Sequence, residues 1–241
     1  RSKVGLATGA ALRRRSPRRL RKRKPGRPYD THNAPDAQNG NEHSTHTFGT
    51  HTIMTSYATL DDWLAHIEAL HAKPIDMGLE RMREMVRRMD IRFSCPVVTV
   101  AGTNGKGSTC AMLESIYGAA GYRTGMHTSP HLLRFNERAR IFGREATDEE
   151  LSEVFEEVER ARGDMTLSYF EFTALGILKL FQRSNLDVVI LEVGLGGRLD
   201  AVNVIDPTAA IITTIGIDHT AFLGTTREAI GLEKAHIYRP G

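Results

Sequence analysis

The residues from Gly102 to Thr109, GTNGKGST, have the types and spacing that suit phosphate binding. Glycines allow backbone N–H groups to face phosphate oxygens, and a helix that begins in such a loop adds positive potential at its N-terminus. In that arrangement Lys106 neutralises the β- and γ-phosphates of a nucleotide, while the hydroxyl of Ser108 or Thr109 binds Mg²⁺. We therefore predict nucleotide contacts along the whole segment, at Gly102, Thr103, Asn104, Gly105, Lys106, Gly107, Ser108 and Thr109.

The spacing departs from the strict GxxxxGK[ST] pattern, because Gly107 separates Lys106 from Ser108. On spacing alone, a plain tight turn is the alternative to a phosphate loop. A β-branched run at residues 96–101 precedes the segment, and a helical pattern follows it to about Ala120. This order of strand, loop and helix favours phosphate binding.

Two further residues with metal-binding potential follow predicted strands. Glu192 ends the apolar run DVVILE, where a carboxylate is costly to bury unless it is paired or bound to a metal. His219 follows the next strand, and a lone histidine is more often a structural residue. We expect Glu192 and His219 to lie beyond adjacent strand ends beside the phosphate loop, where together they would form a second divalent-cation site.

Lys234 lies in the helix that is predicted after His219. A free amine would repel metal ions, so the residues alone favour a solvated lysine that pairs with the neighbouring Glu233. The position of Lys234 on this helix nevertheless allows it to point back toward the strand ends.

The elements that position these residues alternate between strands and helices. Apolar runs predict strands at residues 96–101, 123–128, 187–192 and 208–214. Helical spacing predicts helices at 60–71 and 79–90, from the phosphate loop to about 120, and at 148–162, 170–183 and 225–235, with a capping box at 147–150. This order predicts an α/β fold whose mainly parallel sheet is covered by helices on both faces, with each polar cluster at the carboxyl end of a strand.

The N-terminal segment differs from the rest of the chain. Residues 1–28 hold 12 of the 32 Lys and Arg residues and no Asp or Glu, so the remaining 20 basic residues face 29 acidic ones. Residues 1–53 show no hydrophobic period, and we expect a disordered basic and polar tail ahead of an ordered part at 54–241. The tail is a basic arm for nucleic acid or anionic lipid, a targeting peptide, or non-functional sequence ahead of a true start at Met54.

Composition limits the function classes. No apolar run approaches the roughly 20 residues of a membrane span. The two cysteines cannot build a disulfide framework, which favours a reducing cytosol. We therefore expect a cytoplasmic protein with neither nucleic acid nor a membrane as partner, and we expect it to be a monomer.

Five motifs, in order, resemble those of the folylpolyglutamate synthase family, in particular its bacterial bifunctional dihydrofolate synthase/folylpolyglutamate synthases, within the Mur ligase superfamily. They are GTNGKGST (102–109), TSPHLLRFNER (128–138), EVGLGGRLDAVN (192–203), IGIDHTAFLG (215–224) and GLEKAHIYRPG (231–241). The additional Gly107 is a mark of this family and separates it from the other Mur ligases. The resemblance covers residues 55–241.

The resemblance implies an ATP- and Mg²⁺-dependent ligase that joins L-glutamate to the carboxylate of dihydropteroate or a folate through an acyl phosphate. It implies catalytic roles for Lys106, His219 and Lys234. It implies metal ligands at Ser108, Ser129, Glu192, His219 and Lys234, the last as a carbamate, which would turn the cation into an oxygen ligand. The stretch Ser168, Tyr169 and Phe170 resembles part of the wall that binds the pterin.

Two departures from the family pattern bear on these expectations. His236 stands where the family usually has Gly, and a side chain there could crowd the turn that carries Lys234. Family members are also longer, so we expect the chain to hold the N-terminal part of the ATP-binding ligase domain without the C-terminal domain. The glutamate site and much of the adenine site would then be missing, and the fragment alone would not ligate.

Other function classes stay open at this point. A different Mur-type ATP-dependent amide ligase would share the phosphate loop. A P-loop nucleotide-binding protein without ligase activity would also use Lys106. A nucleic-acid-binding protein would use the basic tail instead.

Overall fold

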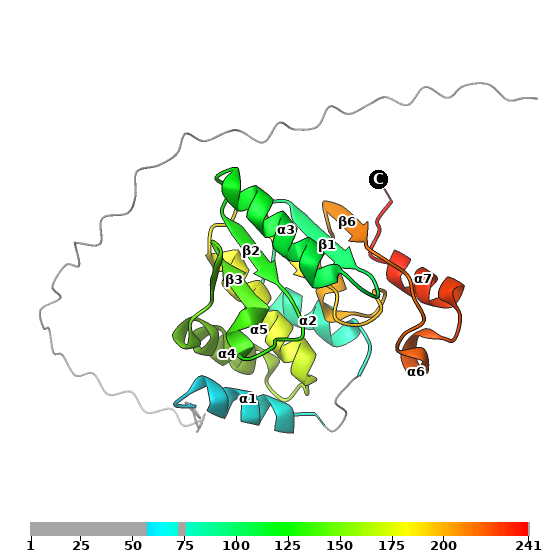
Figure 1. Cartoon of the computed structure of the whole chain (residues 1–241). Coiled ribbons are helices and arrows are strands. Elements are labelled where there is room, and N and C mark those ends of the chain that lie inside the picture. The colour runs from blue at the N-terminus through cyan, green and yellow to red at the C-terminus, as the bar shows by residue number, and fades with distance from the viewer. Residues whose placement is uncertain (1–56, 72–75, 241) are drawn as a thin grey trace, which may run out of the picture. The chain divides into compact units, whose positions relative to one another are not determined.

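The computed structural model describes residues 57–71 and 76–240 (Figure 1). These residues form one six-stranded sheet in the order β4-β3-β2-β5-β1-β6. Four neighbouring strands run parallel: β2 (Thr124–His127), β5 (Val188–Glu192), β1 (Val97–Ala101) and β6 (Ala209–Ile212). At one edge, β3 (Ala139–Ile141) and β4 (Arg144–Glu145) are antiparallel. The predicted mainly parallel α/β sheet is confirmed.

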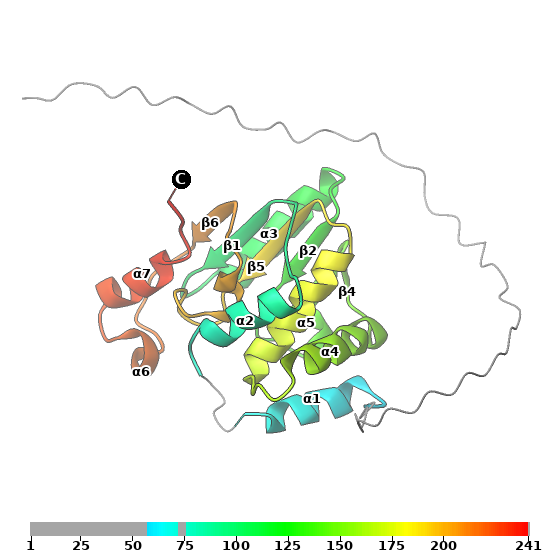
Figure 2. The same ribbon diagram turned by 180° about the vertical axis from the view of Figure 1, so that it is seen from behind.

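Helices cover both faces of this sheet, as the apolar strands predict. One face carries α3 (Lys106–Ala119), whose Cys110 packs with Val98, Val100, Met126, Val188 and Ile190. The opposite face carries α4 (Asp148–Arg162) and α5 (Tyr169–Arg183), with α1 (Leu60–Ala69) and α2 (Glu80–Arg88) packed against them (Figure 2). Every residue of β1 and β5 is consequently buried.

Side-chain caps mark the starts of α4 and α5. The predicted capping box is present at α4, where Thr147 accepts from the backbone N–H of Glu150 and the Glu150 carboxylate accepts from that of Thr147. Ser168 and Glu171 make the same exchange at α5. These reciprocal bonds satisfy two donors that a helix N-terminus otherwise leaves free. The observed helix bounds lie within about two residues of the predicted ones.

Several short elements were not predicted. They are the β3–β4 hairpin, two 3₁₀ turns, η1 (Phe135–Arg138) and η2 (Ala201–Val204), and the single-turn helix α6 (Thr220–Leu223). The last helix, α7 (Arg227–Ala235), lies with α6 beyond the β6 edge of the sheet (Figure 1). The tail predicted at residues 1–53 lies outside the described residues. Within the described ranges, no helix has the length and apolar character that a membrane crossing requires.

Candidate functional site

The loop between β1 and α3 is shaped by two glycines. A Cβ at Gly102 would overlap the Thr213 hydroxyl, so only glycine allows this close approach. Gly105 precedes α3 in the left-handed conformation, with φ at 81°. Thr103 donates its N–H to the Thr214 carbonyl at 2.9 Å, which ties the loop to the segment after β6. The loop thus opens onto the N-terminus of a 14-residue helix, the arrangement expected for phosphate binding.

Two lysines converge on this loop from different helices. The Nζ atoms of Lys106 and Lys234 donate to the same Gly102 carbonyl, at 3.1 and 3.3 Å. Lys234 is only 4% exposed, and burial followed by the charge of Lys106 lowers its pKa. The interpretation of Lys234 as a solvated lysine paired with Glu233 is therefore wrong. Glu233 pairs with Arg198 instead, at 3.0 Å.

Glu192 brings a buried carboxylate to the start of α3. Its Oε2 accepts from the Ser129 N–H at 3.2 Å and lies 3.6 Å from the point where a Cβ on Gly107 would stand. Burial raises the pKa of Glu192. Ser108 is exposed on the first turn of α3. The strand ends of β1, β2 and β5 therefore meet here, as predicted, and the absence of a side chain at Gly107 leaves room beside the carboxylate.

His219 lies on the other side of the loop, which corrects one expectation. Glu192 ends β5 and His219 follows β6, but β1 lies between these strands, so the two strand ends are not adjacent. His219 is half-exposed in the left-handed conformation, and its Nε2 is 3.6 Å from Asp218 Oδ2. The described residues hold no group of three or more His, Cys, Asp or Glu side chains that could bind a metal by themselves. A cation site here needs the serine hydroxyls as well as Glu192.

The phosphate loop and its neighbours fit the groups that the sequence implies. Gly105 leaves space for phosphate oxygens at the N-terminus of α3, whereas Gly102 allows the loop to pack closely against Thr213. Carboxylate and hydroxyl oxygens are hard ligands of the kind that Mg²⁺ and Mn²⁺ accept. The buried Glu192 accepts from the Ser129 N–H and lies in the field of the Lys106 charge, and its free oxygen could bind a cation.

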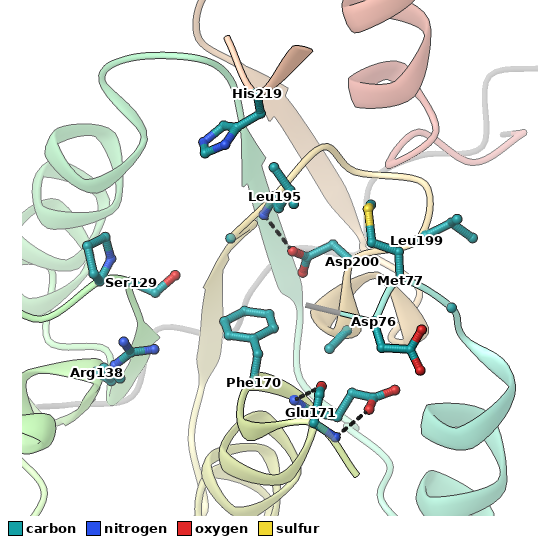
Figure 3. A pocket seen from close by; sticks show the side chains of 15 residues that line it. Asp76, Met77, Ser129, Arg138, Phe170, Glu171, Leu195, Leu199, Asp200 and His219 are labelled. Atoms are coloured by element: carbon teal, nitrogen blue, oxygen red, sulfur yellow. Dashed lines mark hydrogen bonds between the residues drawn. The ribbon is translucent and has the colours of Figure 1, made fainter. Parts of the chain in front are cut away.

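A cavity of about 280 Å³ opens beside Ser129 and His219 (Figure 3). Its walls come from the segment before α2, the start of α5 and the loop after β5, and include Met77, Phe170, Leu195, Leu199, Asp200 and Ala201. Phe170 packs against Gly194 so closely that a Cβ there would come within 2.8 Å of the ring. Phe170 thus offers an aromatic face at the centre of a mostly apolar cavity.

Four charged residues of this cavity were not predicted as site residues: Asp76, Arg138, Glu171 and Asp200. Asp200 is buried and accepts from the N–H groups of Leu195 and Val202, at 2.8 and 3.0 Å. Burial raises the pKa of Asp200 to about 6. Glu171 accepts from Arg81 at 3.0 Å, and Arg81 also pairs with Asp76 at 2.7 Å. Arg81 therefore offsets part of the negative charge of Asp76 and Glu171, whereas Asp200 is held by backbone N–H groups.

Of the three residues predicted to contact the pterin, only two line this cavity. Ser168 and Phe170 line it, whereas Tyr169 lines a separate hollow and packs against Phe135 and Arg138. Tyr169 begins α5, and successive helical residues point about 100° apart, so three consecutive side chains cannot face one cavity. The expectation for Tyr169 is therefore not met by its position.

His236 does not crowd the turn of Lys234. It ends α7 with φ at −69°, a conformation open to any residue. Its ring is exposed, with Nδ1 2.7 Å from the Leu232 carbonyl of the same helix. The concern that a side chain at this position would displace Lys234 is not borne out by the geometry.

Known sequences match this chain over most of its described part. The model of the Mur ligase middle domain matches residues 100–240. The dihydrofolate synthase/folylpolyglutamate synthase of Escherichia coli K12 is 53% identical over 181 residues, which cover 75% of this chain and 43% of that protein. The protein of the same name from Haemophilus influenzae is 51% identical over 187 residues, covering 77% and 43%. The chain thus spans less than half the length of these relatives.

Solved structures agree with the sequence matches. E. coli FolC in complex with DHPP and ADP superimposes with a TM-score of 0.76 at 51% identity, covering 77% of this chain and 45% of that one. The bifunctional folylpolyglutamate synthase/dihydrofolate synthase of Yersinia pestis, complexed with AMPPNP and Mn, gives 0.73 at 52% identity, covering 77% and 46%. With its glycine phosphate loop on a mainly parallel sheet, this chain belongs to the Mur ligase family, whose middle domain it matches from residue 100 to residue 240.

Proposed function

We propose that this chain is part of an ATP-dependent ligase that joins L-glutamate to the carboxylate of dihydropteroate or a folate. The observation that supports this most directly is the position of the cavity. An apolar cavity with an aromatic face and a buried carboxylate opens beside Ser129. The Ser129 backbone N–H donates to the Glu192 carboxylate, which lies at the phosphate loop. A substrate in the cavity would therefore lie next to a nucleotide on the loop.

Nucleotide and metal binding would use the residues gathered at the start of α3. Lys106 would neutralise the phosphates, and the backbone N–H groups from Gly105 to Ser108 would bind their oxygens, since those of Thr103, Asn104 and Thr109 already donate within the protein. Ser108, Ser129 and Glu192, with His219 at the far side of the loop, would hold Mg²⁺ or a similar cation. A carbamate on Lys234 would add an oxygen ligand in place of a repelling ammonium. ADP, AMPPNP and Mn are the ligands of the similar solved structures.

The substrate would enter the cavity with its flat ring against Phe170. Amino and amide N–H groups at the edge of a pterin could donate to Asp200, which is fixed by two backbone N–H groups. The substrate carboxylate would then face the phosphate loop. It would take the γ-phosphoryl group of ATP as an acyl phosphate, and the neutral amine of glutamate would displace phosphate to form the amide. The ligase would work as a cytoplasmic monomer on these small molecules.

Binding measurements on the chain test this proposal. Calorimetry should detect ADP with Mn²⁺, and also dihydropteroate, and Phe170→Ala should weaken dihydropteroate by roughly tenfold or more without changing ADP binding. Asp200→Asn should act in the same direction. ADP binding without any dihydropteroate binding would favour a nucleotide-binding protein of another kind. Binding of a nucleotide-linked cell-wall precursor in place of dihydropteroate would favour another Mur-type ligase.

A further inference from the structure

Helix α7 has little apolar anchorage to the rest of the protein. Its buried side chains are Ile230 and Lys234, one turn apart on the same face, and Ile237 follows just after the helix. Leu232 on the opposite face is exposed. Apart from these isoleucines, Ile215 packs against the helix at Gly231, so polar contacts are needed to fix the helix further. The position of Lys234 therefore depends on those contacts.

The loop Gly194–Asn203 supplies the polar contacts, at the last turn of α7. The Arg198 N–H donates to the Glu233 carbonyl at 3.0 Å, and its Nε donates to both Glu233 carboxylate oxygens at 3.0 and 3.1 Å. Asn203 donates from Nδ2 to the His236 carbonyl at 3.3 Å. At Gly197 a Cβ would come within 2.7 Å of the Glu233 carbonyl oxygen and 3.0 Å of the Lys234 Cα. The loop thus holds the backbone and the side chain of the residue next to Lys234.

The Arg198–Glu233 ion pair is too exposed to add much to the stability of the fold. Arg198 is 45% and Glu233 20% exposed, and ion pairs of such exposure contribute little to folding stability. The ion pair has a larger effect on the position of the Lys234 side chain. A slip of one residue along α7 moves a side chain by about 1.5 Å and rotates it by about 100°. Either change would take the Lys234 Nζ away from the Gly102 carbonyl, which it reaches at 3.3 Å.

We propose that Arg198 is a positioning residue of the phosphate site: through Glu233 it fixes helix α7 so that the Lys234 side chain lies over the phosphate loop. Arg198 itself does not line the cavity, whereas Leu199 and Asp200 beside it do. One loop therefore forms a wall of the cavity and holds Lys234 in place. The importance of the Lys234 position for catalysis rests on the proposed function. The role of Arg198 in fixing that position does not.

Acylation of lysines followed by mass spectrometry tests the proposal on the chain as it is. At one fixed pH and without nucleotide, the buried Lys234 should react slowly. In Arg198→Ala its reaction rate should rise by roughly two- to fivefold, because local opening of α7 becomes easier. Glu233→Gln, which keeps the side-chain shape and removes the charge, should raise the rate in the same direction. Arg144→Ala removes an ion pair of similar exposure, with Glu150, far from α7, and should leave the Lys234 rate unchanged.

Thermal unfolding and ADP binding in the presence of Mn²⁺ separate the possible failures. We expect the Arg198 and Glu233 variants to unfold near the wild-type temperature and to bind ADP more weakly, by roughly tenfold. A folded Arg198→Ala or Glu233→Gln protein with the wild-type Lys234 rate overturns the positioning role. If Arg198→Ala does not fold, Glu233→Gln decides alone. A wild-type chain that binds neither ADP nor dihydropteroate contradicts the proposed function, and the Lys234 rates still decide the role of Arg198.

Discussion

Lys106 and Lys234, from helices on different sides of the phosphate loop, direct their amines at one acceptor, the Gly102 carbonyl oxygen. Two cations that share an oxygen repel one another, and a single neutral carbonyl does not offset this repulsion. A bound polyphosphate would do so. The pair therefore fits a site whose electrostatics are completed by an anion, either a bound polyphosphate or the carbamate that we propose on Lys234.

Lys106→Met should weaken ADP binding in the presence of Mn²⁺ by roughly tenfold or more, since a charged partner of the phosphates is lost. The unfolding temperature without nucleotide should stay the same or rise, because the like-charge contact with Lys234 is gone. Calorimetric titration and thermal unfolding measure the two effects. Arg92→Met, which removes an exposed ion pair with Asp90, is the control and should leave ADP binding unchanged. A Lys106→Met protein with wild-type affinity would return Lys106 to a structural role.

Glu192→Gln should separate binding from stability. Glutamine keeps an oxygen for the Ser129 N–H but cannot supply a charged metal ligand, so Mn²⁺ and nucleotide binding should weaken. The pKa of Glu192 is raised by burial, so the folded state binds its proton more readily than the unfolded state. The carboxylate therefore costs stability once the pH rises through the folded-state pKa. At neutral pH and without metal, Glu192→Gln should be at least as stable as wild type in urea unfolding. A clear loss of stability would show that the carboxylate has a structural partner.

Gly102→Ala and Gly107→Ala form a matched pair in the same loop. At Gly102 the methyl group overlaps the Thr213 hydroxyl, and we expect a loss of about 2–4 kcal/mol in the free energy of unfolding. At Gly107 the methyl group would sit 3.6 Å from the Glu192 carboxylate, an ordinary contact. Gly107→Ala should therefore fold normally and show its effect, if any, in metal binding. Equal losses of stability in the two variants would contradict the conclusion that Gly102 is tightly packed and Gly107 is not.

Local rules account for the parts of the fold that were predicted correctly. The capping box at Thr147 marks the start of α4, and apolar runs mark the four parallel strands. The β3–β4 hairpin was missed because its turn is Phe142-Gly143, with φ of 54° and 78°, and lacks the Asn-Gly or Asp-Gly signal of such turns. The convergence of Ser129 and Glu192 followed from a general rule for parallel sheets.

The cavity shows where a linear sequence is insufficient. Arg138 and Asp200 enter it from a 3₁₀ turn and a loop whose side-chain directions follow no period, so no spacing rule assigns them. Lys234 looked like a surface lysine because Glu233 stands beside it. Glu233 pairs instead with Arg198, which is distant in sequence, so the neighbouring residue gave no sign that Lys234 is buried. Tyr169 was misplaced because three adjacent residues were treated as one surface.

The buried position of His127 leads us to expect that the protein loses stability in acid. It ends β2, its Nδ1 lies 2.8 Å from the Arg138 carbonyl, and its ring lies 6.1 Å from that of Phe170, behind the cavity. Its Nε2 is buried without a hydrogen-bond partner among the described residues. Burial, with a further contribution from the Arg138 charge, lowers the pKa of His127 to about 4.

The sign of the effect follows from proton binding. Between the ordinary pKa of about 6.5 and the folded value of about 4, the unfolded chain binds the His127 proton and the folded chain does not. The stabilising contribution is therefore complete above pH 6.5 and is lost as the pH falls toward 4. At about 1.4 kcal/mol per pKa unit, the loss approaches about 3 kcal/mol.

Urea unfolding of wild type and His127→Phe at pH 7.5, 5.5 and 4.5 measures this contribution. Phenylalanine keeps a ring beside Phe170 but cannot be protonated, although it gives up the bond to the Arg138 carbonyl. We expect His127→Phe to be less stable than wild type, or equal, at pH 7.5 and to lose less stability on acidification. The other histidines and Arg138 are present in both proteins, so their titration cancels in the comparison. If the two proteins lose the same free energy of unfolding between pH 7.5 and 4.5, His127 does not determine the acid sensitivity of the fold.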